Sequence, residues 1–288
     1  SVYMLELNSG MTMKKLCCVL LSLVCAQVSA GTQTWDFTNS TDNGSTLNYD
    51  GYGNSINMVI DGVSLSVSGW SDTRGQSYTS VDETVEQAEL VYYGRNNKQL
   101  GMINQDEGYY GDPGAPNHSI DSYDYNGCWG DDIDMVLLSF SEAVSLEGIT
   151  IGWAREDYYD QVSRKSDITA VAYTGDVANG PNIANRSWAN IASDSAWTFV
   201  ENLMDAQQNS YHTVDDSGNI LSNFWLVGAY NPVFSNTNYS TGNDGFKLSG
   251  ITTSNSTSPP APVPEPGVLM MMLASLGFVL RKRQQKNL

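Results

Sequence analysis

Residues 56–68 read INMVIDGVSLSVS, and this stretch decides the class of fold. Ile56, Met58 and Ile60 occupy alternate positions before an Asp-Gly pair, and apolar residues alternate with serines after it. Alternation with a period of two places one face of a strand in the core. Asp-Gly is a typical two-residue turn, because such a turn needs positive φ angles. The stretch therefore predicts a β-hairpin with one buried face.

Strand patterns continue along the chain. Residues 135–140 are apolar at successive positions, which is typical of a strand buried on both faces in the middle of a sheet. Val144 and Leu146 share one phase, whereas the apolar residues from Ile149 onward take the other, so we expect a β-bulge or tight bend at residues 147–148. Further strands are expected at residues 168–173, 224–230 and 246–251.

The sequence gives little indication of helices. Residues 197–205 fit a short helix, because Trp197, Val200 and Met204 have helical spacing, but residues 197–200 fit a strand equally well. Gly, Asn, Asp and Ser fill the gaps between the predicted strands, as expected of turns and loops. We therefore expect an all-β fold, an antiparallel, jelly-roll-like β-sandwich with long loops, and short helical signal segments at the two ends.

The N-terminal region has the features of a secretory signal peptide, which we place at residues 11–30. Lysines at positions 14–15 precede an apolar stretch at residues 16–26, and small residues follow, in the order that signal peptidase requires. We expect cleavage between Ala30 and Gly31, so that signal peptidase is the first processing partner.

The C-terminal region has three parts. Residues 253–266 are rich in Ser, Thr and Pro and predict an extended stalk. Residues 267–288 contain an uncharged apolar stretch, 267–280, followed by a basic end. That stretch as a helix covers about 21 Å, less than the roughly 30 Å of a bilayer core. The positive-inside rule places the basic end on the cytoplasmic side.

This tail resembles the PEP-CTERM sorting signal, which combines a Pro-Glu-Pro motif, an apolar segment and an Arg-rich end. The matching residues are Val263, Pro264, Glu265, Pro266, Arg281, Lys282 and Arg283. The resemblance implies that an exosortase, a membrane transpeptidase or protease, recognises the tail and removes it. It therefore implies transient membrane anchoring at the cell envelope.

A second resemblance concerns the body of the chain. Over residues 90–251 the chain is similar to a family of exosortase-dependent surface proteins, and it departs from them at residues 121–134 and 155–166. The runs that carry the similarity are PNHSID (116–121), DMVLLSF (134–140), IGW (151–153), AYTG (172–175), FWLVGAY (224–230) and FKL (246–248). The resemblance implies a surface location and no particular chemistry.

Charge and cysteine content limit the partners and the fold. Of the 14 basic and 32 acidic residues, 6 and 2 lie outside residues 31–264, which leaves 8 against 30 and a net charge of −22. Such a surface repels nucleic acid and anionic lipids, so nucleic-acid binding is excluded. Cys128 is the one cysteine after the signal peptide, so the domain at residues 31–252 has no internal disulfide.

Standard catalytic motifs are absent from the sequence, including G-x-S-x-G, H-E-x-x-H and the phosphate-binding loops. The chain has 2 histidines, His118 and His212, and we expect His118 to be structural. A glycosidase would need two carboxylates, and candidates are Glu142, Glu156, Asp157 and Asp160. With so many acidic residues, however, some pairs reach the required separation by chance.

One acidic stretch has the composition of a Ca²⁺ site. Calcium takes 6–8 oxygen ligands at flexible geometry, and closely spaced Asp and Asn in a glycine-containing loop supply them. The candidate ligands are Asp121, Asp124, Asn126, Asp131 and Asp134, with Asp132 in the same stretch. The pattern is not an EF-hand, because Ser122 and Ile133 occupy the first and last ligand positions. The alternative is a solvated loop with Asx turns.

Aromatic residues gather in the predicted loops, and Tyr and Trp are well suited to binding surfaces. They are Tyr109, Tyr110, Tyr123, Tyr125, Trp129, Tyr158 and Tyr159, which could instead pack the loops against the sheets. We therefore expect a non-catalytic surface or matrix protein that binds extracellular polysaccharide and has no cofactor other than Ca²⁺. The alternative function is a secreted carbohydrate-active hydrolase.

Overall fold

The computed structural model contains the predicted hairpin. Strand β3 (Ser55–Ile60) pairs antiparallel with β4 (Val63–Thr73) across a two-residue turn. Asp61 and Gly62 have φ angles of 51° and 86°, the positive values that this turn requires. The alternating apolar side chains of both strands are buried.

The structure describes residues 31–38, 46–47, 51–73, 84–93, 99–105, 118–122, 132–156, 162–215, 220–235, 237 and 239–255. Besides β3 and β4, these residues form the strands β1 (Thr32–Asp36), β2 (Thr46–Leu47), β5 (Thr84–Tyr93), β6 (Gln99–Ile103), β7 (Ile120–Asp121), β8 (Asp134–Glu156), β9 (Lys165–Tyr173), β10 (Trp197–Gln207), β11 (Ser210–Thr213), β12 (Ser222–Ala229) and β13 (Asp244–Ser254), and the helix α2 (Trp188–Ala192). The predicted all-β fold is confirmed.

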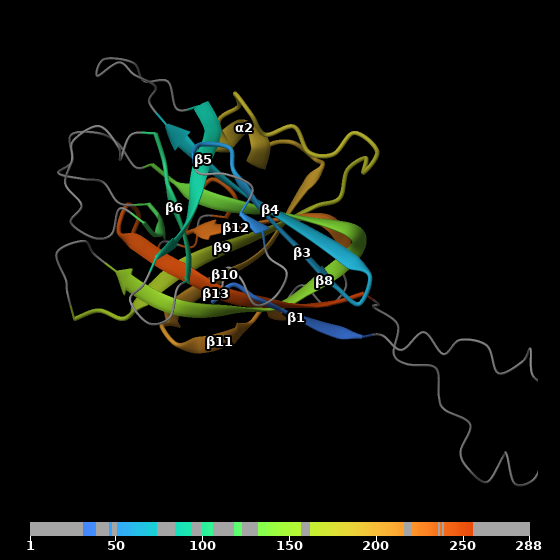
Figure 1. Ribbon diagram of the computed structural model, residues 1–288. Helices are drawn as coiled ribbons and strands as arrows, with labels where there is room; N and C mark the ends of the chain where they lie inside the picture. Colours follow the sequence, from blue (N-terminus) through green and yellow to red (C-terminus); the bar gives the residue numbers. More distant parts are fainter. Residues whose placement is uncertain are drawn as a thin grey trace, which may run out of the picture. The chain divides into compact units, whose positions relative to one another are not determined.

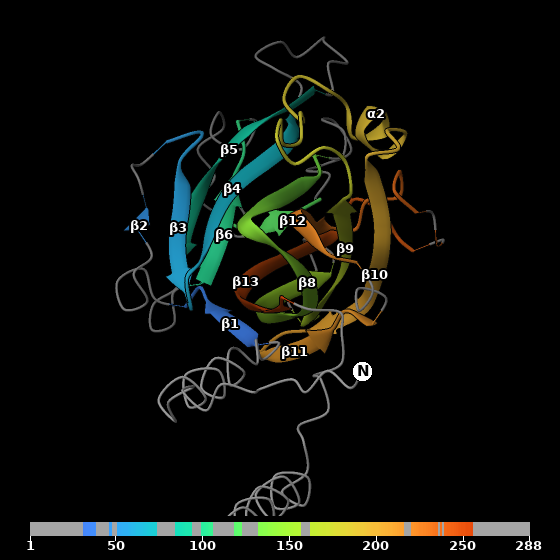
Figure 2. The same ribbon diagram turned by 90° about the vertical axis from the view of Figure 1, so that its right-hand side faces the viewer.

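The strands form an antiparallel sandwich of two layers joined by shared strands. One layer has the order β10-β9-β12-β8-β4-β3-β2, as Figure 2 shows from β10 on one side to β3 on the other. The other layer contains β13, with β1, β6 and β7, and the β8–β11 pair. The first half of β8 pairs with β4 and β12, and its second half pairs with β13 and β11, so β8 crosses from one layer to the other.

The bulge predicted in β8 is also confirmed. In the ladder between β8 and β13, Thr252 lies opposite Gly148 and Thr253 lies opposite Leu146. Glu147 is therefore the extra residue of a β-bulge. This shift changes the phase of the apolar residues along one continuous strand.

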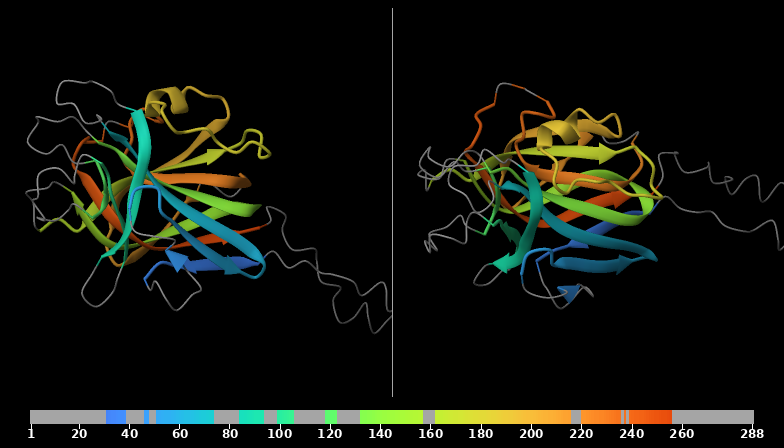
Figure 3. Two further views of the ribbon diagram at one scale, coloured as in Figure 1. Left: turned by 45° about the horizontal axis from the view of Figure 1, so that its top comes forward. Right: turned by 90° about the horizontal axis from the view of Figure 1, so that it is seen from above.

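The apolar residues of the central strands fill two cores, which explains why residues 135–140 are apolar on both faces. Val136 and Leu138 face the main core between the layers, whereas Met135 and Leu137 face a second core. Helix α2 and the chain around it cover that second core, with Trp188 and Ile191 among its members. Figure 3 shows this segment lying over the edge of the sandwich.

Residues 197–205 belong to strand β10, so the strand alternative is confirmed and the helix alternative is wrong. Two register shifts in the β9–β10 ladder leave buried residues at every third position, 197, 200, 203 and 206. This spacing resembles that of a helix. The one helix among the described residues, α2, was not predicted, and Ser187 caps it by accepting a hydrogen bond from the Asn190 N–H.

The two ends of the domain lie together at one end of the sandwich, which we call the proximal end (Figure 1). In the β1–β13 ladder, Thr32 lies opposite Ser254, and the Gly31 N–H donates to Asn255 Oδ1 over 3.3 Å. Residues Gly31–Thr257 form one compact unit. None of the helical segments in the described part of the chain has the length and apolar character to cross a membrane.

Candidate functional site

The opposite end of the sandwich, which we call the distal end, is where the strands place their acidic residues. Strand β13 runs from Asp244 at this end to Ser254 at the proximal end, and Asp244 lies opposite Glu156 at the end of β8. Strand β8 also begins here, at Asp134, because it bends back on itself between the layers. Carboxylates distant in sequence therefore meet.

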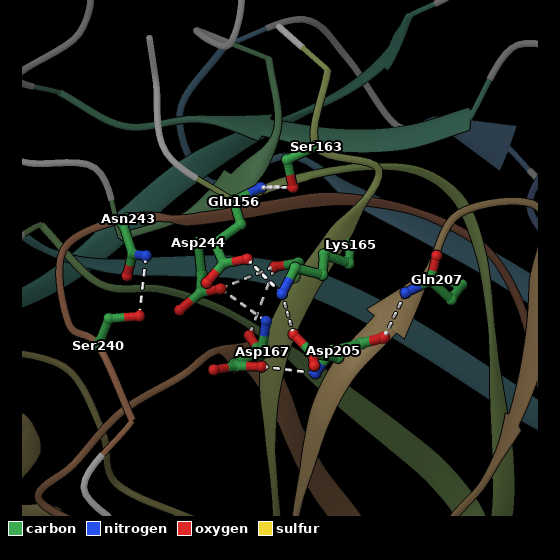
Figure 4. Close-up of polar contacts among 10 residues, drawn as sticks. Glu156, Ser163, Lys165, Asp167, Asp205, Gln207, Ser240, Asn243 and Asp244 are labelled. Carbon is green, nitrogen blue, oxygen red and sulfur yellow. Dashed lines mark hydrogen bonds and ion pairs between the residues drawn. The ribbon is translucent and has the colours of Figure 1, made fainter. Parts of the chain in front are cut away.

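Asp244 is completely buried, and only one of its two carboxyl oxygens has a hydrogen-bond partner. Its Oδ1 accepts hydrogen bonds from the Asp167 N–H over 2.6 Å and from Ser166 Oγ over 3.4 Å. Its Oδ2 is also buried and has no hydrogen-bond partner. Burial, and then the charges of Asp167 and Glu156, raise the pKa of Asp244 to about 8. Figure 4 shows these groups together.

Lys165 neutralises the more exposed carboxylates of this group. Its Nζ lies 2.8 Å from Glu156 Oε2 and also pairs with Asp205. These hydrogen bonds, first to Asp205 and then to Glu156, raise the pKa of Lys165 above its usual range. Glu156 and Lys165 also line a shallow surface depression with Val162, Ser163, Arg164 and Gln207. We call Glu156, Lys165, Asp167, Asp205 and Asp244 the distal acidic cluster.

A second pair of buried carboxylates consists of Asp121 and Asp134. The Asp121 N–H donates to Asp134 Oδ2 over 3.3 Å, and Asn104 Nδ2 donates to Asp134 Oδ1 over 3.4 Å. Ser119 Oγ lies 2.7 Å from Asp121 Oδ2. Burial, and then the charge of Asp121, raise the pKa of Asp134 well above its usual value.

The pair and the cluster are joined by the backbone. The Ser122 N–H donates to the Asp244 carbonyl over 2.8 Å, and the Asp244 N–H donates to Ser122 Oγ over 3.3 Å. A short pairing of β7 with β13 continues from this contact. Hydrogen bonds therefore connect the two groups of carboxylates at one junction.

Beside this junction, two cationic side chains contact the ring of Trp153 on β8. Lys247 Nζ lies 5.2 Å from the centre of the Trp153 ring, and Arg155 Cζ lies 5.5 Å from it. Such cation–π contacts are stabilising, the more so where water is excluded. Burial lowers the pKa of Lys247 to about 8; the charge of Asp121 opposes this, and that of Arg155 adds to it.

The predicted calcium site is brought together in part. Asp121 and Asp134 are neighbours, whereas Asp124, Asn126 and Asp131 lie outside the described residues. Among the residues that the structure does describe, no three His, Cys, Asp or Glu side chains are arranged to hold a metal ion. The calcium site proposed from the loop therefore stays a prediction.

The other residues singled out from the sequence have separate positions. Glu142 is exposed where β8 bends near the proximal end, so it lies far along the strand from Glu156; Asp157 and Asp160 lie outside the described residues. His118 precedes β7, and its carbonyl oxygen faces Gly101 closely. His212 lies on β11, where its Nε2 is 2.9 Å from the Gln207 carbonyl.

Several predictions fall outside the described residues. These are the signal peptide, the stalk beyond Asn255, the sorting motif with its basic end, and the seven loop aromatics. Asp167, Asp205 and Asp244, which were not singled out from the sequence, form the core of the distal acidic cluster. The one signal for Asp167 and Asp244 was that each stands just before a predicted strand.

Comparisons with protein-family models, with curated proteins and with solved structures find no match for this chain.

Proposed function

We propose that this protein is an exported β-sandwich of the cell surface or extracellular matrix. In this proposal signal peptidase and an exosortase process its two ends, and the domain binds extracellular polysaccharide without cleaving it. It rests on the sequence resemblances above and on the arrangement of the domain.

The pairing of β1 with the end of β13 is the observation that supports this proposal most directly. Gly31, the expected first residue of the mature chain, is hydrogen-bonded to Asn255, where the predicted stalk has begun. Both predicted processing sites thus connect to the proximal end. A domain held by a stalk at one end presents its other end to the surroundings.

The described residues that flank the predicted binding loops lie at the distal end. The stretches 106–117, 123–131 and 157–161 hold the seven loop aromatics, and the described residues that flank them are joined there by hydrogen bonds. Asn104, Ser122 and Glu156 are among these flanking residues. Aromatic faces bind sugar rings through apolar contact while their polar groups remain hydrated.

Burial of the carboxyl groups argues for binding rather than hydrolysis. A glycosidase needs a protonated carboxyl group that reaches the scissile bond. Asp244 and Asp134, whose raised pKa values suit such an acid, are both 0% exposed. In the described part of the chain, these acids are therefore shielded from a polymer in solution.

The test is a sedimentation assay with extracellular polysaccharide prepared from the producing cells, combined with an assay for reducing sugar. We expect the protein to sediment with the polysaccharide while reducing sugar stays at its starting level. Trp129→Ala should sediment less with the polysaccharide. The control Tyr211→Ala, which removes an aromatic that is 50% exposed on β11, should sediment as the unmodified protein does. Reducing sugar that rises with time would instead identify a hydrolase, and a lack of sedimentation would refute polysaccharide binding.

A further inference from the structure

Two successive residues at the start of β13 each have a buried side-chain oxygen with no hydrogen-bond partner. These oxygens are Oδ2 of Asp244 and Oδ1 of Asn243. Leaving buried acceptors unsatisfied is costly, and such atoms usually mark an absent ligand or ordered water. In Figure 4 the free oxygen of Asp244 is turned away from Asp167, toward the side on which Asn243 and Ser240 lie.

The charges around Asp244 indicate which kind of ligand would satisfy these atoms. Among the described residues, Lys165 pairs with Glu156 and Asp205, and no ion pair reaches Asp244 or Asp167. A carboxylate buried there is stable only when it is paired or coordinates a metal, and without a cation it takes up a proton instead. A bound cation would contact the free oxygens and stabilise the ionised carboxylate at the same time.

We propose that Asp244, Asn243 and Glu156 form a calcium site at the distal end, separate from the loop predicted from the sequence. Carboxylate and amide oxygens are ligands for hard cations, and Ca²⁺ accepts the irregular geometry that two strand ends provide. Glu156 lies opposite Asp244 in the β8–β13 ladder, which brings its carboxylate to the same place. With only two carboxylates, the other ligands are amide oxygen and water.

A site with so few charged ligands binds weakly, on the order of 10⁻⁴ to 10⁻³ M, as in other extracellular calcium modules. At about one hundred times the dissociation constant, bound Ca²⁺ raises the melting temperature by about 5–10 °C for a domain of this size. Mg²⁺ at equal ionic strength should give a much smaller shift, because it gives up its water reluctantly.

The test is thermal unfolding of the full chain in metal-free buffer with added CaCl₂ or MgCl₂. Asp244→Asn should abolish the calcium shift, since it removes one charge and keeps the side-chain shape. Asp176→Asn is the control: it removes one charge at an exposed loop position outside both groups of carboxylates and should keep the shift. Circular dichroism verifies that both variants are folded.

Asn243→Ala gives a second test that leaves the buried carboxyl group in place. It should raise the calcium dissociation constant about tenfold, because it removes one oxygen ligand. A calcium shift that survives in Asp244→Asn, that disappears in Asp176→Asn, that Mg²⁺ reproduces, or that is absent from the unmodified protein would each overturn the proposal.

Discussion

Carboxyl groups at the distal end differ in how their charge is neutralised. Glu156 and Asp205 share the ammonium group of Lys165 at a half-exposed position. Asp134 and Asp244 are fully buried and, among the described residues, form no ion pair. Because burial disfavours the charged form, protonation is how these two groups avoid an isolated charge in metal-free solution.

This difference predicts how stability depends on pH. In the presence of a chelator, the free energy of unfolding should fall between about pH 4 and about pH 8. In this range folded Asp244, with a pKa of about 8, keeps a proton that the unfolded chain, with a pKa of 3.8, releases. One such group lowers stability by up to about 1.4 kcal/mol per pH unit. Asp134 and Asp167, whose pKa values are also raised, act in the same direction.

Urea unfolding at a series of pH values measures this slope. Asp244→Asn should make it shallower, whereas Asp176→Asn, at an exposed loop position, should leave it unchanged. Above about pH 8 the contribution of Asp244 should end, because the folded protein has then released that proton too. Lys247 should act in the opposite direction there, because its folded pKa is lowered from 10.5 to about 8 and the unfolded state then holds the extra proton. The same slope in Asp244→Asn as in the unmodified protein would contradict this account.

Strand β12 approaches the start of β8 closely beside the site. A Cβ atom at Gly228 would lie 2.3 Å from the Asp134 carbonyl oxygen, which belongs to the backbone and cannot rotate away. Gly228→Ala should therefore lower the free energy of unfolding by about 1–3 kcal/mol, the usual cost of overpacking. Urea unfolding at neutral pH measures the change.

Gly69→Ala is the matched control for this prediction. A Cβ atom at Gly69 would lie 2.4 Å from Met102 Sδ, near the end of a flexible side chain that can move. Gly69→Ala should lower the free energy of unfolding by less than about 1 kcal/mol. If Gly69→Ala were as destabilising as Gly228→Ala, the argument from backbone contact would be wrong.

The strands show how far the sequence could predict this structure. Where the ladder is regular, as at β3 and β4, alternation identified both strands, and a change of phase located the bulge at Glu147. Strand β10 was ambiguous because its two bulges give the buried residues a spacing of three. Helix α2 has five residues, too few for a periodic pattern.

The acidic site could be predicted only where it is local in sequence. Asp121 and Asp134 are close along the chain and were identified together. Asp167, Asp205 and Asp244 come from three strands, and pairing across the sheets brings them into one cluster. No local sequence motif indicates that these three residues are close in space, and the many other acidic residues make them hard to single out.

In the molecule as a whole, the two ends of the domain and the buried carboxylates lie apart. The first and last strands of the domain, β1 and β13, meet at the proximal end, whereas the buried carboxylates Asp134 and Asp244 lie at the distal end. Cleavage at the two predicted sites should therefore leave the distal acidic cluster unchanged. The one strand close to a predicted cleavage site is β1, which begins at Thr32.

Processing of both ends can be measured by intact mass on protein recovered from the producing cells. We expect a mature chain that begins at Gly31, which leaves β1 complete and its ladder with β13 intact. We also expect it to lack the segment after about Pro264, because the tail resembles a substrate of exosortase. Replacement of residues 263–266 by alanine, or loss of the exosortase, should leave the basic end attached. A major species that retains residues 281–288 in unmodified cells would contradict the sorting prediction, and a start inside β1 would contradict the cleavage site.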